Sequence, residues 1–203
     1  KDSVAGIARY QYEEVILYDL EVTFSSGLGE RARDEFIEKY IEGEGDCLFA
    51  SVSTVDAGSG GSGIPAKLVA FGEGDIGRFF NLQSGNSLSL SGGQAIISMQ
   101  IADRYGLKEG DKVGVYANLK WAEFEVAAVF ENHVGNYVFI TLSAYERVYG
   151  EAPVNTAFIS AENEELGARI SSDPLVSYVT YTAQLKEKVT SSMSSINYIV
   201  VFI

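Results

Sequence analysis

Apolar positions recur at helical spacing at both ends of the chain. Near the beginning, one helical face would carry Val4, Ile7, Ala8 and Gln11, and Asp2 or Ser3 is available as an N-cap. Near the end, apolar residues recur every three or four positions, at Leu185, Val189, Met193, Ile196, Val200 and Ile203. We therefore predict helices over residues 1–14 and 183–203, which would form a stalk if they lie together.

The sequence closes on an apolar run, residues 196–203, that contains no charge, glycine or proline. A membrane helix needs about 20 apolar residues, so this run cannot cross a bilayer, but it is how such a helix would begin. The alternative is a hydrophobic strand packed on the core. Helical spacing favours a truncated membrane helix. Because the chain starts with Lys1 and shows no signal-peptide pattern, we expect it to be processed or cut from a longer protein.

Two segments show the order strand, helix, strand. The first is predicted over residues 15–24, 30–43 and 46–55, and the second over residues 155–161, 162–171 and 175–182. Two such units far apart in the sequence can pack as the halves of one α+β layer. We expect residues 15–72 and 151–182 to be those halves.

Residues 73–150 show a different pattern, in which predicted strands predominate. Leu88 and Leu90 alternate with serines, residues 94–105 follow, and strands are predicted over 113–116, 121–130 and 137–142. We interpret this region as a small β-rich subdomain inserted into the α+β subdomain. Just before it, residues 58–63 (GSGGSG) have the composition of a flexible linker, either an engineered replacement or a natural mobile loop.

The net charge and the supply of reactive side chains restrict the possible classes of function. The chain has 203 residues, with 28 acidic and 15 basic side chains and a net charge of −13. This negative charge excludes a protein that binds nucleic acid by neutralising phosphates. It also argues against an anchor to anionic lipids. A single cysteine, Cys47, and a single histidine, His133, exclude an internal disulfide and paired-thiolate or two-histidine metal sites. Phosphate-cradling glycine motifs are absent. We predict no catalytic, metal or cofactor site.

The remaining candidates have structural interpretations. The tripeptide Glu-Gly-Asp begins at residues 44, 73 and 109, and we interpret all three copies as turns with positive-φ glycines rather than Ca²⁺ ligands. Asp111 is expected to accept a hydrogen bond from a nearby backbone amide. His133 is expected in a loop, and Cys47 is expected to be a small core residue.

One aromatic doublet suggests a contact surface. Phe79 and Phe80 follow a glycine-rich turn, and adjacent residues of an extended segment point to opposite faces. At most one ring would then be easily buried, and the other would mark a partner contact. Burial of both rings would rule the hypothesis out.

Three segments carry a resemblance to a known family. They are residues 94–111 (QAIISMQIADRYGLKEGD), residues 124–149 with Glu131-Asn132, Asn136-Tyr137-Val138-Phe139 and Tyr145, and residues 195–200 (SINYIV). Together they resemble the extracytoplasmic, MacB-like periplasmic core domain of FtsX-like or MacB-like permease subunits of ABC transporters, particularly the large forms of Gram-positive bacteria. The linker-like residues 58–63 depart from the family, where an ordinary hairpin or loop is expected.

The resemblance implies a noncatalytic domain on the extracytoplasmic side of the cell membrane. Such a domain would transmit ATP-driven motion through its stalk to a substrate or protein outside. ATP would be used by a separate cytoplasmic subunit, reached through membrane helices that this sequence lacks, and a second permease copy would be a further partner. The alternative is a free-standing secreted or surface-anchored binding module. An enzyme would need a pocket around His133 or a close carboxylate pair.

Overall fold

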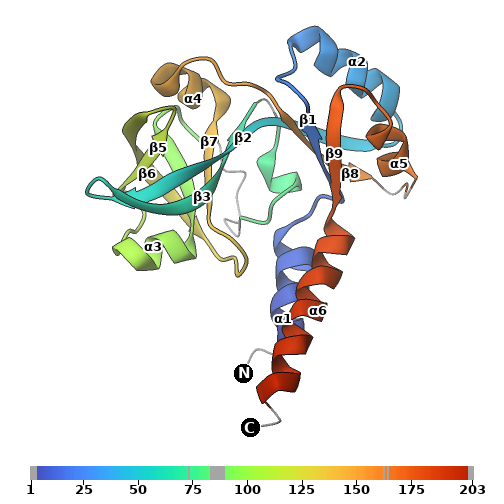
Figure 1. The fold of residues 1–203 in the computed structure, drawn as a ribbon. Helices are drawn as coiled ribbons and strands as arrows, with labels where there is room; N and C mark the ends of the chain where they lie inside the picture. The colour runs from blue at the N-terminus through green and yellow to red at the C-terminus, as the bar shows by residue number, and fades with distance from the viewer. Residues whose placement is uncertain (1–3, 73, 83–89, 162, 164, 201–203) are drawn as a thin grey trace.

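The computed structural model describes residues 4–72, 74–82, 90–161, 163 and 165–200, which form two lobes and a helical stalk (Figure 1). The helices are α1 (Val4–Arg9), the π-helix η1 (Tyr10–Val15), α2 (Glu30–Tyr40), the 3₁₀-helix η2 (Ile76–Arg78), α3 (Met99–Tyr105), α4 (Leu142–Tyr149), α5 (Leu166–Ser171) and α6 (Thr182–Val200). The strands are β1 (Leu20–Phe24), β2 (Gly45–Ser59), β3 (Ser62–Phe71), β4 (Gln94–Ser98), β5 (Lys112–Ala117), β6 (Lys120–Phe130), β7 (Tyr137–Thr141), β8 (Thr156–Ala161) and β9 (Val176–Tyr181).

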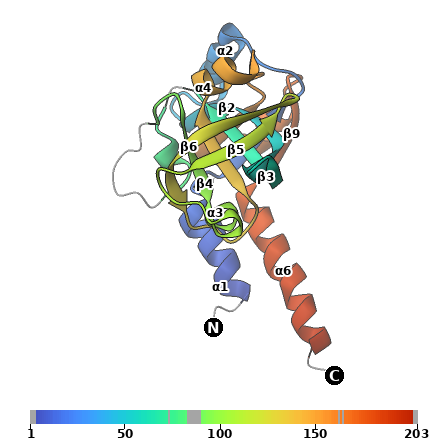
Figure 2. The same ribbon diagram turned by 90° about the vertical axis from the view of Figure 1, so that its left-hand side faces the viewer.

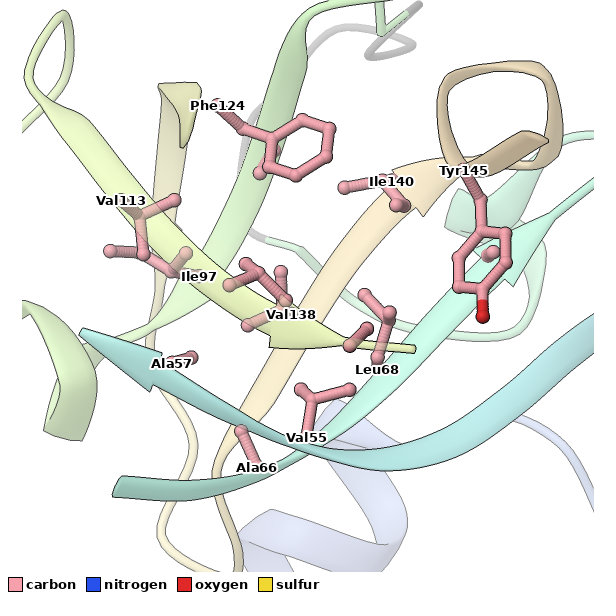
Figure 3. Close-up of a cluster of buried hydrophobic side chains, with 14 of the residues drawn as sticks. Val55, Ala57, Ala66, Leu68, Ile97, Val113, Phe124, Val138, Ile140 and Tyr145 are labelled. Atoms are coloured by element: carbon pink, nitrogen blue, oxygen red, sulfur yellow. The ribbon is translucent and has the colours of Figure 1, made fainter. Parts of the chain in front are cut away.

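Six strands close into a barrel. Their order is β3-β7-β4-β6-β5-β2, and pairing between β2 and β3 completes the ring. The pairs β3–β7 and β4–β6 are parallel, and the other pairs are antiparallel. Because side chains alternate along each strand, every second residue points into the barrel. Figure 3 shows this interior, which includes Val55, Leu68, Ile97, Val113 and Phe124.

The second lobe, which we call the outer lobe, is a sheet covered by helices on one face. Its strands follow the order β2-β8-β1-β9, all antiparallel, so the two strand–helix–strand segments of the sequence lie in one sheet. Apolar residues of α2 and α5 pack on the same side of these strands; Phe36, Tyr40, Leu166 and Ile170 are buried there. Residues 45–50 of β2 pair with β8, and residues 50–59 pair with β3, so one strand belongs to both lobes.

Two local predictions are wrong. Residues 15–19 are not a strand: Val15 ends η1, and β1 begins only at Leu20. The linker-like residues 58–63 are instead the end of the β2–β3 hairpin. Gly58 pairs with Gly63, Ser59 pairs with Ser62, and Gly60 and Gly61 have φ of 62° and 77°. That geometry is a two-residue type I′ turn, in which glycine avoids the strain of positive φ.

Most other elements agree with the sequence. Residues 94–105 form a short strand and then a helix, β4 and α3, and strands β5, β6, β7, β8 and β9 overlap the ranges predicted for them. Leu88 and the proposed N-cap residues Asp2 and Ser3 lie outside the described residues.

The stalk consists of α1, η1 and α6, which run side by side away from the lobes (Figures 1 and 2). Within the described residues, both predicted terminal segments are helical, over 4–15 and 182–200. In the part of the chain that the structure describes, no helix is both long and apolar enough to cross a membrane. The final residues 201–203 of the predicted membrane-helix start lie outside that part.

We expect Asp173→Asn to destabilise the outer lobe by about 1–3 kcal/mol, the usual cost of losing hydrogen bonds to a buried charge. Its carboxylate accepts from Lys39 Nζ at 2.8 Å, Tyr40 hydroxyl at 2.8 Å and the Leu175 amide at 2.9 Å. Burial raises the pKa of Asp173, but these donors outweigh burial and lower it. Urea titrations of both proteins measure the difference.

The pH dependence follows from the direction of that shift. A carboxyl whose folded pKa lies below its unfolded value contributes stability above the unfolded pKa, about 4 for aspartate, and loses it as the pH falls through the folded pKa. The wild-type advantage over Asp173→Asn should therefore be full near neutral pH and shrink under acid. An advantage that is constant down to acid unfolding would contradict an ionic role for Asp173.

Candidate functional site at the stalk junction

The described residues offer little for catalysis. Within them, no three His, Cys, Asp or Glu side chains are close enough to hold a metal ion. His133 lies in the β6–β7 loop, as expected, with its Nε2 3.6 Å from Glu131. Burial raises the pKa of the Cys47 thiol to about 12, and this residue packs against the outer-lobe core. At neutral pH the thiol is protonated and therefore a poor nucleophile.

The acidic tripeptides are structural where they are described. Asp111 accepts a hydrogen bond from the Lys108 amide at 2.9 Å, which confirms the predicted turn. Gly74 and Gly110 have positive φ, as predicted, but Gly45 does not, because it already lies in β2 and pairs with Ala161. Glu73 lies outside the described residues.

A pocket with a volume of about 1040 Å³ opens beside the first turn of α6. It is lined by Asp19, Leu20, Gly43, Glu44, Gly45, Asp46, Ser160, Ala161, Asn163, Tyr181, Ala183 and Gln184. Its three carboxylates already have partners: Asp19 accepts from the Ala161 amide, Glu44 from Asn163 and Arg169, and Asp46 from Arg78. None of the residues that line it is a histidine, cysteine or lysine.

The polar and aromatic contacts of interest gather instead where the stalk meets the lobes. As the chain leaves η1 it forms a short ladder with the segment that follows η2. Ile16 bridges to Phe80, the Leu17 amide donates to the Phe79 carbonyl at 2.9 Å, and the Asn81 amide donates to the Val15 carbonyl at 2.8 Å. These bonds fix the upper end of the stalk to the chain that enters the barrel.

Phe79 and Phe80 are both buried, with 3% and 1% of their surface exposed. The predicted partner-contact surface at these residues is therefore wrong. The premise of an extended segment fails because Phe79 has φ −113° and ψ −24°, a helical conformation that ends η2, so the two rings do not have to point to opposite faces.

Phe80 instead joins all three parts of the molecule. Its ring lies 5.3 Å from Tyr18 after the stalk, 4.9 Å from Phe139 in the barrel wall and 5.2 Å from Phe158 in the outer lobe, each in an edge-to-face arrangement. Such pairs add to the free energy gained by burying the rings. The three parts therefore share one apolar core at this point.

A buried glutamine links the stalk to the barrel. Gln11, in η1, is only 1% exposed, and its Oε1 accepts from the backbone amides of His133 at 2.8 Å and Val134 at 3.2 Å. The neighbouring Tyr10 ring packs against the His133 ring at 5.1 Å. These contacts join the β6–β7 loop to the first stalk helix.

The second stalk helix is tied to the first. Thr182, the first residue of α6, donates its hydroxyl to the Tyr18 carbonyl and its amide to the Asp19 carbonyl. Farther along, Lys186 forms an ion pair with Glu13. This hydrogen bond, and a second one from Arg9, lower the pKa of Glu13. The two helices are therefore connected at their tops and along their length.

A charge pair connects the two lobes just above this point. Lys67 of β3 contacts Glu21 of β1, with Nζ 2.5 Å from Oε1, and the side chains are 29% and 14% exposed. The Tyr18 hydroxyl also donates to Glu21 at 3.2 Å. Burial, followed by the Glu21 charge, raises the pKa of Tyr18 well above its usual value.

Sequence reasoning missed these residues as a group, because the contacts join segments more than 40 positions apart. One signal was present: Gln11 is a polar residue on the apolar helical face that also carries Val4, Ile7 and Ala8. A polar side chain on a buried face must find a hydrogen-bond partner.

The chain matches no protein-family model and no curated protein sequence. Among solved structures, it resembles the extracellular domain of the noncanonic ABC-type transporter YknZ from Gram-positive bacteria. The TM-score is 0.56 at 14% identity, and the match covers 84% of this chain and 92% of that one. This likeness shows that the two share a fold, as the sequence resemblance predicted.

Two further solved structures match with lower scores. The periplasmic region of MacB from Actinobacillus actinomycetemcomitans has a TM-score of 0.49 at 12% identity, with 86% of this chain and 94% of that chain covered. A domain of a protein described as a permease from Porphyromonas gingivalis has a TM-score of 0.48 at 12% identity, with 79% and 78% covered.

Proposed function

We propose that this chain is the noncatalytic extracytoplasmic domain of an ABC transporter permease of the FtsX-like or MacB-like type. Its stalk would carry ATP-driven motion from the membrane to the lobes, which act on a substrate or protein outside. The ATP-binding subunit would be a separate cytoplasmic protein, joined through membrane helices that continue the stalk, and a second permease copy would complete the transporter.

The observation that carries this proposal is the construction of the stalk. Two helices from opposite ends of the sequence leave the lobes in the same direction, and the shared YknZ fold comes from an ABC-type transporter. Displacement of the first helix would act on the barrel through Gln11 and on the shared core through Ile16 and Phe80. Motion of this kind needs no reacting side chain.

The alternative is a secreted or surface-anchored binding module. It would use the same lobes without coupling to ATP. The full-length gene product distinguishes the two: a permease resists alkaline extraction from the membrane and purifies with an ATP-hydrolysing subunit, whereas the module does neither.

The transmission step can be measured with spin labels in the full-length protein and its ATP-binding subunit. Lys188→Cys on α6 and Glu109→Cys in the barrel form a pair that crosses from the stalk to a lobe, and both residues are exposed. The protonated Cys47 leaves the introduced cysteines to label selectively. We expect the stalk-to-barrel distance distribution to differ between ATP-bound and ADP-bound states.

The matched control is a pair of labels within the barrel lobe, at the exposed positions Thr54→Cys and Glu109→Cys. Their distance distribution should be the same in the ATP-bound and ADP-bound states. Gln11→Ala should keep ATP hydrolysis but reduce the nucleotide-dependent shift, because the β6–β7 loop loses its bond to η1. The proposal fails if ATP is hydrolysed while the stalk-to-barrel distances stay unchanged.

A further inference from the structure

Three side chains lie at one level on the outer wall of the barrel. In the strand register, Asp56 of β2 pairs with Tyr116 of β5, and Tyr116 pairs with Trp121 of β6. Their neighbours Ala57, Val115 and Ala117 belong to the barrel core, so the alternation of the strands turns these three side chains outward. Opposite residues of adjacent antiparallel strands lie about 5 Å apart. We call this carboxylate, phenol and indole the outer row.

The next level of the same wall has two paired glycines in place of side chains. Gly58 pairs with Gly114, and a Cβ on Gly114 would collide with the Trp121 indole. A Cβ on Gly58 would likewise collide with the ring of Tyr105, which comes from the end of α3. Aromatic rings therefore occupy the space above both glycines, next to the outer row.

The polar groups of the outer row have no side-chain partner among the described residues, although the Trp121 indole packs over Gly114. No hydrogen bond or ion pair of the side chains of Asp56, Tyr116 or Trp121 occurs among the described residues. Asp56 is exposed, and Tyr116 keeps 41% of its surface in water. The basic residues nearest in the β5–β6 hairpin are already engaged: Lys112 with Glu123 at 3.7 Å, and Lys120 with the Val148 carbonyl at 2.9 Å.

The turn of the same hairpin exposes an apolar side chain at a conformational cost. Asn118 and Leu119 have φ of 46° and 61°, a type I′ turn whose second position favours glycine. A left-handed conformation is strained for a residue with a Cβ. Leu119 is nevertheless 89% exposed. Backbone strain of this kind clusters at functional sites, which makes the exposed Leu119 a candidate contact residue.

We propose that the outer row binds an arginine or lysine side chain of an extended basic segment in a partner protein, with an apolar neighbour of that cation packing on Leu119. Aromatic faces attract cations, indole most strongly, and a carboxylate beside them supplies the counter-charge. Arginine suits the site best, since its guanidinium stacks on rings and pairs with carboxylates. The net charge of −13 attracts such a segment from a distance.

Trp121 is the one tryptophan of the chain, so its fluorescence reports on this site alone when tyrosine is not excited. The probe is an acetylated, amidated peptide of alternating arginine and glycine, and its matched control replaces every arginine with glutamine. We expect a saturable change in Trp121 emission with the arginine peptide only, and weaker binding at higher salt because exposed charges are screened.

Asp56→Asn should weaken peptide binding about threefold to fivefold, the range for an exposed ion pair worth up to about 1 kcal/mol. Asp34→Asn is the matched control: this exposed residue of α2 carries the same charge in the outer lobe, and its removal should leave binding unchanged. Tyr116→Leu should weaken binding about twofold to fivefold through the lost ring.

The proposal is overturned if the arginine peptide produces no saturable change, if the glutamine peptide produces the same change, or if Asp34→Asn weakens binding as much as Asp56→Asn. The last result would indicate attraction to net charge without a site. Because this assay uses neither ATP nor the membrane, its outcome does not depend on the proposed transport function.

Discussion

Phe80→Ala is expected to lower the free energy of unfolding by about 3–5 kcal/mol, the usual cost of replacing a fully buried phenylalanine by alanine. Phe80 is 1% exposed and contacts Tyr18, Phe139 and Phe158. The resulting cavity lies where the stalk, barrel and outer lobe share one core, and none of these parts can fill it without separating from the others.

The expected consequence beyond lost stability is lost cooperativity. In the wild type, Trp121 fluorescence reports on the barrel and far-ultraviolet circular dichroism reports largely on the helices of the stalk and outer lobe, and the two should follow one urea transition. In Phe80→Ala the two transitions should separate. Phe80→Leu retains most of the volume and serves as the control. A loss below 1 kcal/mol in Phe80→Ala would contradict the central position of this ring.

The second large effect is expected at Lys67. Lys67→Met removes the cation beside Glu21, whose side chain is only 14% exposed, and leaves a poorly solvated carboxylate with the Tyr18 hydroxyl but no counter-ion. Removing one partner of a buried pair typically costs 3–5 kcal/mol. Because Lys67 is itself 29% exposed, we expect about 2–3 kcal/mol in urea unfolding.

A double-mutant cycle separates the pair from its parts. Glu21→Leu combined with Lys67→Met should recover most of the lost stability, because both charges are then absent. Lys112→Met is the comparison, since its pair with Glu123 is largely exposed and should contribute less than about 1 kcal/mol. If the double variant is less stable than Lys67→Met alone, the charge pair is not the cause of the loss.

Hydrophobic periodicity predicted the helices and strands whose apolar residues keep one spacing, helical or alternating, from end to end. The β4–α3 segment changes from a short apolar run to helical spacing at Ser98, and Gly106 ends α3 with φ 65°, so both ends of the helix can be recognised in the sequence. Residues 15–19 were misassigned because Val15, Ile16 and Tyr18 are apolar or aromatic and buried. That composition is shared by buried strands and by an irregular segment packed between layers.

The barrel itself was beyond prediction from local pattern. Its closure depends on the pairing of β2 with both β3 and β5, and on parallel pairing between β3 and β7 across more than 60 residues. The candidate site was misplaced for a related reason. The doublet Phe79–Phe80 was judged as an extended segment with one free face, whereas long-range packing surrounds it with apolar residues of three different parts.

The position of β2 in both lobes has a consequence for biosynthesis. The barrel strands come from residues 45–141, an uninterrupted stretch, whereas β1 must pair with β8 and β9, which lie more than 130 residues later. During synthesis, which starts at the N-terminus, all barrel strands are made before β8 and β9, so the barrel can close first. Strand β1 stays unpaired until β8 and β9 have been made. Closure of the barrel then presents residues 45–50 of β2 as a ready template on which β8, and then β1 and β9, assemble.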